Sequence, residues 1–264
     1  MQTNGGSDTV LITGATSGIG YELAKLFAKD KFNLVIVGRH EETLEGVAEY
    51  FQYLGSPRVT IIAKDLSRPG TAMEVYELTL SQGIHVDILV NDAGAGVYGL
   101  FSETDIDKEL AIIQLNIVAL VHLTKLYLRD MLSMRKGRIL QLASVSSYQP
   151  TPFLSVYAAS KAFVLSFTDS LINETEGTGV TVTALIPGAT DTDFFRKAHA
   201  EHTKAARNDP APASEVAKVG YEALMKGKHH AVAGAAVQAN VLLSNVLPNE
   251  SVASRARKQM EVEK

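Results

Sequence analysis

Short apolar runs alternate with longer amphipathic segments along almost the whole chain. The apolar runs lie at residues 10–13, 34–37, 59–63, 88–90, 139–142, 180–186 and 231–233. Several of them are apolar throughout, without the alternation of a strand that faces water on one side. Such strands are typical of parallel sheets that helices cover on both faces. The need to cover these strands on both faces restricts the fold more than any other feature of the sequence.

The amphipathic segments between these runs predict helices. They lie at residues 19–30, 41–54, 69–82, 106–135, 155–176 and 213–227. The alternation of strand and helix predicts an α/β fold, with a doubly wound parallel sheet of about seven strands flanked by helices. Because the sequence contains no repeat and no low-complexity linker, we expect one domain over residues 9–264, preceded by a flexible lead over residues 1–8.

Two polar segments interrupt the pattern. Residues 191–212 follow the carboxyl end of a predicted strand, where ligands bind in such sheets. We interpret them as a substrate lid, with a solvated surface helix as the alternative. Residues 248–264 form a polar tail, which is interpreted as a loose helix or an oligomer contact.

Composition argues against several classes of protein. The 264 residues include 25 basic and 29 acidic side chains, a net charge of −4, which disfavours a nucleic-acid-binding protein. The sequence has no cysteine, so it offers no disulfide and no thiolate metal site, and we expect no bound metal. No signal peptide and no run of about 18 apolar residues is found, so we expect a cytoplasmic protein without a membrane span.

A glycine-rich turn follows the first predicted strand directly. It reads Thr13-Gly14-Ala15-Thr16-Ser17-Gly18-Ile19-Gly20, after which a helix begins. The glycines let the backbone turn sharply and approach a ligand closely, and the start of the helix offers free amide groups to a phosphate. An ordinary turn can also be rich in glycine, but the order strand, turn, helix predicts a dinucleotide site.

The ends of the second and third predicted strands bear on the choice of dinucleotide. An NAD site usually places an acidic residue after the second strand, whereas this chain has Gly38 and Arg39 there. Because Arg39 could pair with a 2′-phosphate, NADP(H) is favoured over NAD(H), with a solvent-facing arginine as the alternative. Asp65 after the third strand is a candidate acceptor for the adenine amino group, or a simple turn residue.

Candidate catalytic residues come from three further segments. Tyr157 and Lys161 lie four residues apart, on one face of a predicted helix. A nearby ammonium would lower the pKa of Tyr157 from about 10 and suit it to proton transfer near neutral pH, although most such pairs are surface residues without a role. Ser144 ends the fifth strand and could hydrogen-bond a substrate oxygen. Asn116 lies among apolar residues of a long helix, where a structural hydrogen bond is the alternative.

Taken together, the motifs resemble those of the short-chain dehydrogenase/reductase family over roughly residues 9–232. They are Thr-Gly-x-x-x-Gly-x-Gly at 13–20, Asn-x-Ala-Gly at 91–94, the set Asn116, Ser144, Tyr157 and Lys161, and Pro-Gly-x-x-x-Thr at 187–192. The chain is similar to bacterial uncharacterised reductases and also to ketoacyl and hydroxysteroid reductases. The resemblance implies a single-domain Rossmann-type fold and an oxidoreductase, and it does not fix a substrate.

The resemblance implies a role for each residue of the set. Tyr157 would be the general acid in carbonyl reduction and the base in alcohol oxidation. Lys161 would depress its pKa and hold the nicotinamide ribose, Ser144 would hold the substrate oxygen, and Asn116 would hold a water that relays protons. The implied dinucleotide contacts are Gly14, Thr16, Ser17, Gly18, Ile19, Gly20, Arg39, Asp65, Leu66, Asn91, Ala93, Gly94, Tyr157, Lys161, Pro187, Gly188, Thr190 and Thr192.

Mostly apolar side chains near the expected nicotinamide position form the predicted substrate pocket. They are Val97, Tyr98, Ser146, Gln149, Phe153, Phe194 and Phe195. Since this set contains no arginine or lysine, we expect a mainly apolar ketone or aldehyde as the substrate. The resemblance also implies a homodimer or homotetramer, joined through the predicted helices at 106–135 and 155–176.

Two positions depart from the family pattern. Asp92 stands where the second asparagine of Asn-Asn-Ala-Gly is usual, which adds a negative charge near the nucleotide cleft. Ala143 stands where the first of two serines is usual, and Ser144 is the one expected to act. A non-catalytic, dinucleotide-sensing protein on the same fold is the alternative function. Other chemistry on this fold, such as epimerisation or dehydration, is a third hypothesis.

Overall fold

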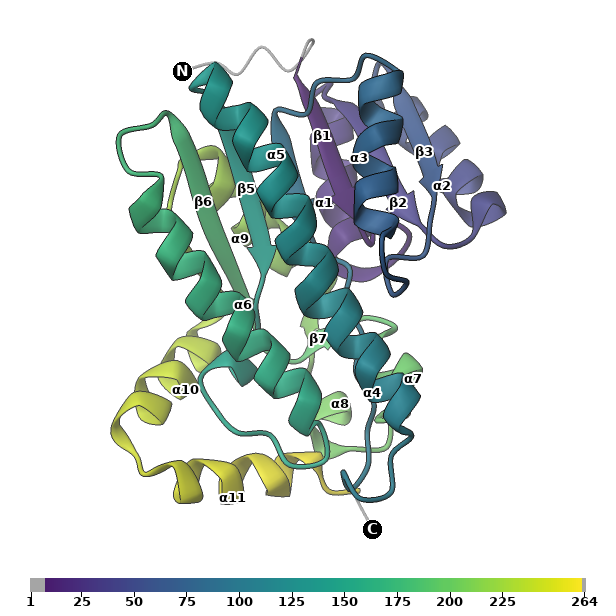
Figure 1. Cartoon of the computed structure of the whole chain (residues 1–264). Helices are drawn as coiled ribbons and strands as arrows, with labels where there is room; N and C mark the ends of the chain where they lie inside the picture. The colour runs from purple at the N-terminus through teal and green to yellow at the C-terminus, as the bar shows by residue number, and fades with distance from the viewer. Residues whose placement is uncertain (1–7, 263–264) are drawn as a thin grey trace.

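Seven parallel strands form one sheet in the order β3-β2-β1-β4-β5-β6-β9 (Figure 1). The computed structural model describes residues 8–262, without the side chains at positions 235, 236, 240, 245 and 246, so most of the expected lead and the last two residues lie outside it. The strands are β1 (Thr9–Thr13), β2 (Asn33–Gly38), β3 (Val59–Ala63), β4 (Ile88–Asn91), β5 (Gly137–Leu142), β6 (Val180–Pro187) and β9 (His230–Ala233). The predicted doubly wound sheet is confirmed.

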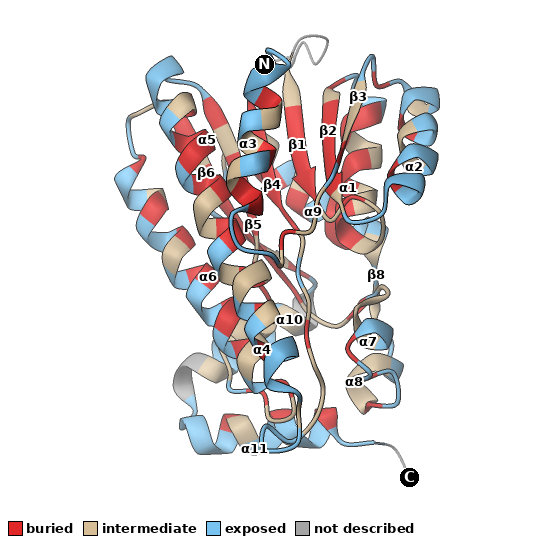
Figure 2. Ribbon diagram, turned by 45° about the vertical axis from the view of Figure 1, so that its right-hand side comes forward, coloured by how far each residue is buried: buried red, intermediate tan, exposed pale blue. Residues whose placement is uncertain are grey.

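Helices cover both faces of the sheet. One face carries α1 (Gly18–Lys29), α2 (Glu41–Leu54) and α9 (Ala213–Met225), and the other carries α3 (Thr71–Ser81), α5 (Leu120–Met134) and α6 (Ser155–Glu174). Val10 and Ile12 of β1 pack into the first layer, whereas Leu11 packs into the second. Figure 2 shows the central strands as almost continuously buried. Burial on both faces therefore explains the unbroken apolar runs.

The predicted helix at 106–135 is divided by a wide turn. It consists of α4 (Ile106–Ile113), a π-helical turn (Gln114–Ala119) that contains Asn116, and α5. Within the described residues, the stretch Ile106–Met134 has the length and composition of a membrane span, with a mean hydropathy of 1.6 in its most apolar window. However, 44% of that window is buried inside the protein, and α5 packs on the sheet, so we interpret the stretch as a core helix.

Strand register aligns the carboxyl ends of the three central strands. Thr13 at the end of β1 is paired with Asn91 of β4, and Asn91 is paired with Gln141 of β5. The loops that follow these strands therefore leave the sheet at the same level. In a doubly wound sheet this edge is where ligands bind.

The segment at 191–212 is neither one surface helix nor an open loop. It contains α7 (Phe194–Lys197) and α8 (Lys204–Arg207), and its ends are held together by pairing of β7 (Thr190–Asp191) with β8 (Ala211–Pro212). This paired stem attaches the two short helices to the sheet edge beside the end of β6.

The described part of the polar tail forms a helix, and this helix packs on its own chain. This helix, α11 (Asn249–Met260), follows α10 (Ala235–Val246) and lies across the end of the molecule next to α8 (Figure 1). Met260 joins a small separate core with Leu154, Ala198 and Ala200. This core connects α11 with the loop before α6 and the segment after α7.

Candidate active site

A cavity of about 780 Å³ lies at the carboxyl edge of the sheet. Its walls come from the loops after the strands β1 to β6 and from parts of α4, α6, α7 and α11. The order of the strands changes direction at β1: β2 and β3 lie on one side of β1, and β4 lies on the other. In such sheets, ligands bind at the carboxyl ends of the strands at this point. Its volume falls in the usual range for sites that bind cofactors and small molecules.

The glycine-rich turn at one side of the cavity fits a diphosphate group. Gly14 and Gly18 have φ angles of +78° and +62°, which residues with a side chain rarely adopt. A Cβ atom on Gly14 would lie 2.9 Å from Oδ2 of Asp92 and 3.0 Å from the backbone of Ala93. Gly18 and Ile19 begin α1 and line the cavity, so the free amide groups of the first helical turn lie at its wall.

Charged residues line the cavity beyond the ends of β2 and β3. Arg39, Lys64 and Asp65 all contribute to the wall. Oδ1 of Asp65 accepts hydrogen bonds from the amide of Ser67 (3.0 Å) and from its hydroxyl (2.7 Å). Burial acts to raise the pKa of Asp65, but these bonds and the charge of Arg39 outweigh it and lower the pKa. Asp65 thus shapes a turn and also lines the cavity.

Ser144, Tyr157 and Lys161 meet in the same cavity. Ser144 follows β5, and its hydroxyl accepts from the amide of Ser146 (3.1 Å) and hydrogen-bonds the Tyr157 side chain. One helical turn after Tyr157, Nζ of Lys161 donates to the carbonyl oxygen of Leu142 (2.7 Å) and lies 5.8 Å from the centre of the Tyr157 ring. The structure therefore brings together three residues of the predicted catalytic set.

The pKa values of this group differ from expectation. Burial raises the pKa of Tyr157 to about 12, with the bond from Ser144 acting to lower it and the charge of Asp92 acting to raise it. Burial also lowers the pKa of Lys161 to about 8, against the attraction of Asp92. The pKa of Tyr157 is therefore raised and not lowered as expected, because burial dominates and Nζ of Lys161 donates to the carbonyl oxygen of Leu142. Tyr157 is held in its neutral, proton-donating form.

Asn116 holds the backbone beside the cavity instead of lining it. Its side-chain oxygen accepts from the amide of Ala95, and its Nδ2 donates to the carbonyl oxygen of Ala95 and to Oγ of Ser160, all at 3.0 Å. A Cβ atom on Gly94 would lie 3.4 Å from Oδ1 of Asn116 and 3.5 Å from Nζ of Lys161. Asn116 and Lys161 thus approach the same point of the chain from two helices.

Asn91 and Gly20 also lie behind the wall, although both were expected to contact the dinucleotide. Nδ2 of Asn91 donates to Oε1 of Gln141 and to Oγ1 of Thr124, both at 3.0 Å, which ties β4 to β5 and α5. Gly20 is buried in α1, where a Cβ would collide with Asp92. Asn91 thus ties neighbouring strands together, and Asn91 and Gly20 support the wall from beneath.

The substrate end of the cavity matches expectation in part. Val97, Ser146, Gln149, Phe194 and Phe195 line it. Phe194 packs directly on the catalytic candidate, with its ring 4.8 Å from the Tyr157 ring.

Tyr98 and Phe153, also expected as walls, are not among the lining residues. Their rings lie 5.5 Å apart, and the hydroxyl of Tyr98 donates to the carbonyl oxygen of Met260 (2.7 Å). The prediction for this pair is corrected: its polar and aromatic groups turn toward α11 and hold that helix in place.

Two helices supply lining residues that sequence reasoning missed. These residues are Lys108, Ala111, Ile112 and Leu115 near α4, and Arg255, Ala256, Gln259 and Met260 of α11. A signal for α11 was available, because Val252, Ala256 and Met260 recur every fourth residue in an otherwise polar tail and are all buried. The segment at 191–212 also reaches the glycine-rich turn, since Nζ of Lys197 in α7 donates to Oγ of Ser17 (3.3 Å).

Comparison with known proteins supports the same interpretation of the fold and site. The short chain dehydrogenase family profile matches residues 8–203. An uncharacterised oxidoreductase of Staphylococcus epidermidis is 33% identical over 182 residues, which cover 69% of this chain and 77% of that protein. An 11-beta-hydroxysteroid dehydrogenase of Pinus massoniana is 37% identical over 188 residues, which cover 71% of this chain and 52% of that protein.

A solved structure extends the likeness to nearly the whole chain. A short-chain dehydrogenase from Sphingobium yanoikuyae in complex with NADPH has a TM-score of 0.81 and 27% identity, covering 94% of this chain and 99% of that chain. The family profile, the sequence relatives and the fold therefore agree. The chain belongs to the short-chain dehydrogenase/reductase family, whose members are oxidoreductases that act on CH–OH or C=O groups of small molecules with a nicotinamide dinucleotide.

Proposed function

We propose that this protein transfers a hydride between NADP(H) and a mainly apolar ketone, aldehyde or alcohol, with Tyr157 as the general acid and base. One observation carries the proposal. Ser144, Tyr157 and Lys161 line the same cavity as the glycine-rich turn, so the proton donor and the dinucleotide site share one space. A dinucleotide-sensing protein would need the dinucleotide site but not the proton donor.

Each side chain has a distinct part in the reaction. When bound, the dinucleotide supplies or accepts the hydride. The hydroxyl of Ser144 holds the substrate oxygen next to Tyr157 and stabilises the charge that develops on it. Tyr157 delivers its phenolic proton to that oxygen during reduction and takes it back during oxidation. Lys161 orients the ribose of the dinucleotide and, as a cation one helical turn away, favours the transient phenolate.

The preference for NADP(H) rests on Arg39. This guanidinium lines the cavity directly after β2, next to Gly38, where a carboxylate would repel a 2′-phosphate. Asp65 is a nearby carboxylate, but its Oδ1 is engaged by Ser67. A planar guanidinium pairs well with a phosphate monoester, so Arg39 discriminates between the two dinucleotides.

The walls around Tyr157 favour an apolar substrate. Val97, Leu154, Phe194, Phe195 and Met260 surround the space in front of its ring. Lys108 and Arg255 also border the cavity, but both are exposed at its rim.

A homodimer or homotetramer is part of the proposal. Phe163 on α6 and Ile106, Leu110 and Ile113 on α4 are exposed large apolar side chains on the two helices expected to form the contact.

The test is a binding and turnover assay with both reduced dinucleotides. Nicotinamide absorbance would be followed with ketones, aldehydes, quinones, steroids and ketoacyl thioesters. We expect tighter binding of NADPH than of NADH, and a loss of about 10- to 100-fold in NADPH affinity for Arg39→Ala, as for loss of a charged hydrogen bond. Arg68→Ala, an exposed arginine in the same region, is the matched control. Equal or better binding of NADH would contradict the proposed preference.

A further inference from the structure

Asp92 is a buried carboxyl group that the proposed reaction does not use. It follows β4 directly and its backbone amide donates to Oγ1 of Thr13 at the end of β1 (3.1 Å). Its side chain turns under the glycine-rich turn: Oδ2 lies 2.9 Å from where a Cβ on Gly14 would be, and the amide of Gly20 donates to the carboxyl group. Only 9% of the residue is exposed.

The other carboxyl oxygen lacks a hydrogen-bond partner. Within the part of the chain that the structure describes, Oδ1 of Asp92 is buried and unpartnered. The charged or titratable groups that face it are Lys161 and Tyr157 of α6, with the amide of Gly20 from α1. Lys161 directs its hydrogen bond to the carbonyl oxygen of Leu142 instead. A buried, ionised oxygen without a donor is unfavourable, so the site favours a proton on this group.

The glycine-rich turn lies between Asp92 and the expected diphosphate. The same cavity is lined by Asp92 and by residues of the turn, namely Gly14, Gly18 and Ile19. A bound dinucleotide would therefore bring at least two negative charges to the opposite side of a thin layer of glycine backbone. The family usually has a neutral asparagine at this position. The Asp92 carboxylate would instead repel the diphosphate, and it can lose its negative charge only by taking up a proton.

We propose that binding of the dinucleotide is coupled to uptake of one proton by Asp92, so that affinity falls as the pH rises. This inference rests on the proposed function. The proton comes from solvent and converts the carboxylate to the neutral acid, and no other bond changes. Burial raises the pKa of Asp92 to about 7 in the protein without cofactor, against the attraction of Lys161 and the Gly20 amide, and the diphosphate raises this pKa further. Between the two pKa values, linkage predicts that the Kd rises up to tenfold per pH unit.

Binding measurements on the full-length, cofactor-free protein test the proposal. The Kd for NADPH would be measured by fluorescence from about pH 6.5 to 9, above the pKa of about 6 of a phosphate monoester. Calorimetry in two buffers with different heats of ionisation would count the protons taken up. We expect a Kd that rises severalfold to tenfold per unit above about pH 7, and uptake approaching one proton per dinucleotide near neutral pH. Because calorimetry uses the wild-type protein, this readout needs no variant that folds.

Variants identify the group that titrates. In Asp92→Asn we expect tight binding with little pH dependence, whereas Asp169→Asn, an exposed aspartate of α6 outside the cavity, should behave as wild type. Lys161 also loses its charge near pH 8, so Lys161→Met is needed: it should bind more weakly but keep the pH dependence.

Three results would overturn the proposal. They are a flat Kd for wild type, no proton uptake, or a slope that persists in Asp92→Asn and vanishes in Lys161→Met. These failures leave the proposed function intact. A failure of the proposed function itself would give a different result, because folded wild-type protein would then bind neither NADPH nor NADH at any pH.

Discussion

Two aspartates flank the same buried strand, and their carboxyl groups differ in how many hydrogen-bond partners they have. Asp87 comes directly before β4 and Asp92 directly after it, and both are 9% exposed. Asp87 lies in a complete set of partners, whereas Asp92 has one oxygen with no hydrogen bond among the described residues. The two ends of one strand therefore show what a buried carboxyl group does for stability and what it does for function.

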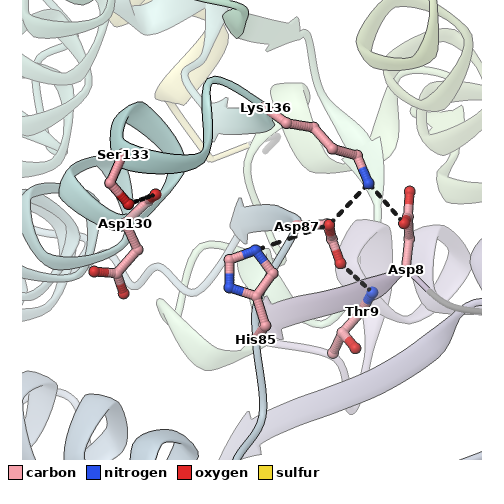
Figure 3. A network of polar contacts seen from close by, with 7 residues as sticks. All are labelled: Asp8, Thr9, His85, Asp87, Asp130, Ser133 and Lys136. Carbon is pink, nitrogen blue, oxygen red and sulfur yellow. Dashed lines mark hydrogen bonds and ion pairs between the residues drawn. The ribbon is translucent and has the colours of Figure 1, made fainter.

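The partners of Asp87 join three parts of the chain (Figure 3). Its Oδ2 accepts from the amide of Thr9 in β1 (2.9 Å), and its Oδ1 accepts from Nζ of Lys136 before β5 (3.0 Å). Lys136 also pairs with Asp8 (2.8 Å), and His85 lies 4.0 Å from Asp87. This network fixes the amino ends of β1, β4 and β5 in register, at the edge of the sheet opposite the cavity.

The carboxyl edge of the sheet has the opposite character. Asp92, Tyr157 and Lys161 all have pKa values shifted by burial toward their neutral forms. Clusters of shifted pKa values are typical of functional sites, where stability is given up for reactivity. Substitutions at the amino edge should therefore lower stability and spare activity. Substitutions at the carboxyl edge should lower activity and keep or raise stability.

Of the three substitutions that test this contrast between the edges, Lys161→Met should have the largest effect. Without the cation, transfer of the Tyr157 proton loses its support, and kcat should fall by about 100-fold or more. The melting temperature should stay the same or rise, because an apolar side chain of similar length replaces a buried ammonium. Steady-state kinetics and thermal unfolding of the same preparation check both. A melting temperature lowered by many degrees would show that Lys161 is chiefly a structural residue and would break the contrast between the edges.

Asp87→Ala should produce the converse result. Removing the carboxyl group leaves the Thr9 amide and Lys136 without their acceptor, which should lower the free energy of unfolding by about 1–3 kcal/mol. The kcat should stay within about twofold of wild type, since the residue is at the far end of β4. Denaturant unfolding and kinetics of this variant would be compared with Asp169→Asn. Lost turnover in a fully folded Asp87→Ala protein would contradict this contrast between the edges.

The smallest expected effect is a gain in stability for Asp92→Asn that depends on pH. The pKa of Asp92 is raised from 3.8 to about 7 by folding, so the folded state binds this proton more tightly than the unfolded state. The wild type therefore loses stability from this group as pH rises from about 4 to 7, and the Asp92→Asn variant does not. At pH 8 the variant should be more stable than wild type, an effect that shrinks toward pH 4. Urea unfolding at both pH values measures it, and an equal or lower stability at pH 8 would argue against an ionised Asp92.

Most of the fold could be predicted from the sequence because the strands are buried on both faces. The strand over residues 59–63 and the helix over residues 41–54 are found with the predicted bounds, and the other elements of the sheet and its covering layers differ by a few residues at their ends. The π-helical turn around Asn116 was missed, since its flanking residues continue a helical pattern. The tail helix α11 was missed as part of the site because most of its residues are polar and its burial depends on contacts with α8 and Tyr98.

The site could be predicted only as a set of residue types. The resemblance to the family predicted that Ser144 at a strand end and the helical pair Tyr157 and Lys161 share one site, and the three residues line one cavity. The sequence predicted a lowered pKa for Tyr157, whereas burial raises it and Lys161 makes its hydrogen bond to Leu142. The sequence also did not distinguish Tyr98 and Phe153, which turn away from the cavity, from Phe194 and Phe195, which line it. Side-chain direction in loops is set by tertiary contacts that no local pattern encodes.

The most direct test of the proposed chemistry compares wild type with Tyr157→Phe. NADPH affinity, melting temperature and turnover on the best carbonyl substrate would be measured side by side. The proposal predicts that the variant binds NADPH as tightly as wild type and is at least as stable, while kcat falls by about a thousandfold, within the range for removal of a general acid. If Tyr157→Phe turned over within a few-fold of wild type, Tyr157 would not be the proton donor and the assignment of this cavity would be wrong.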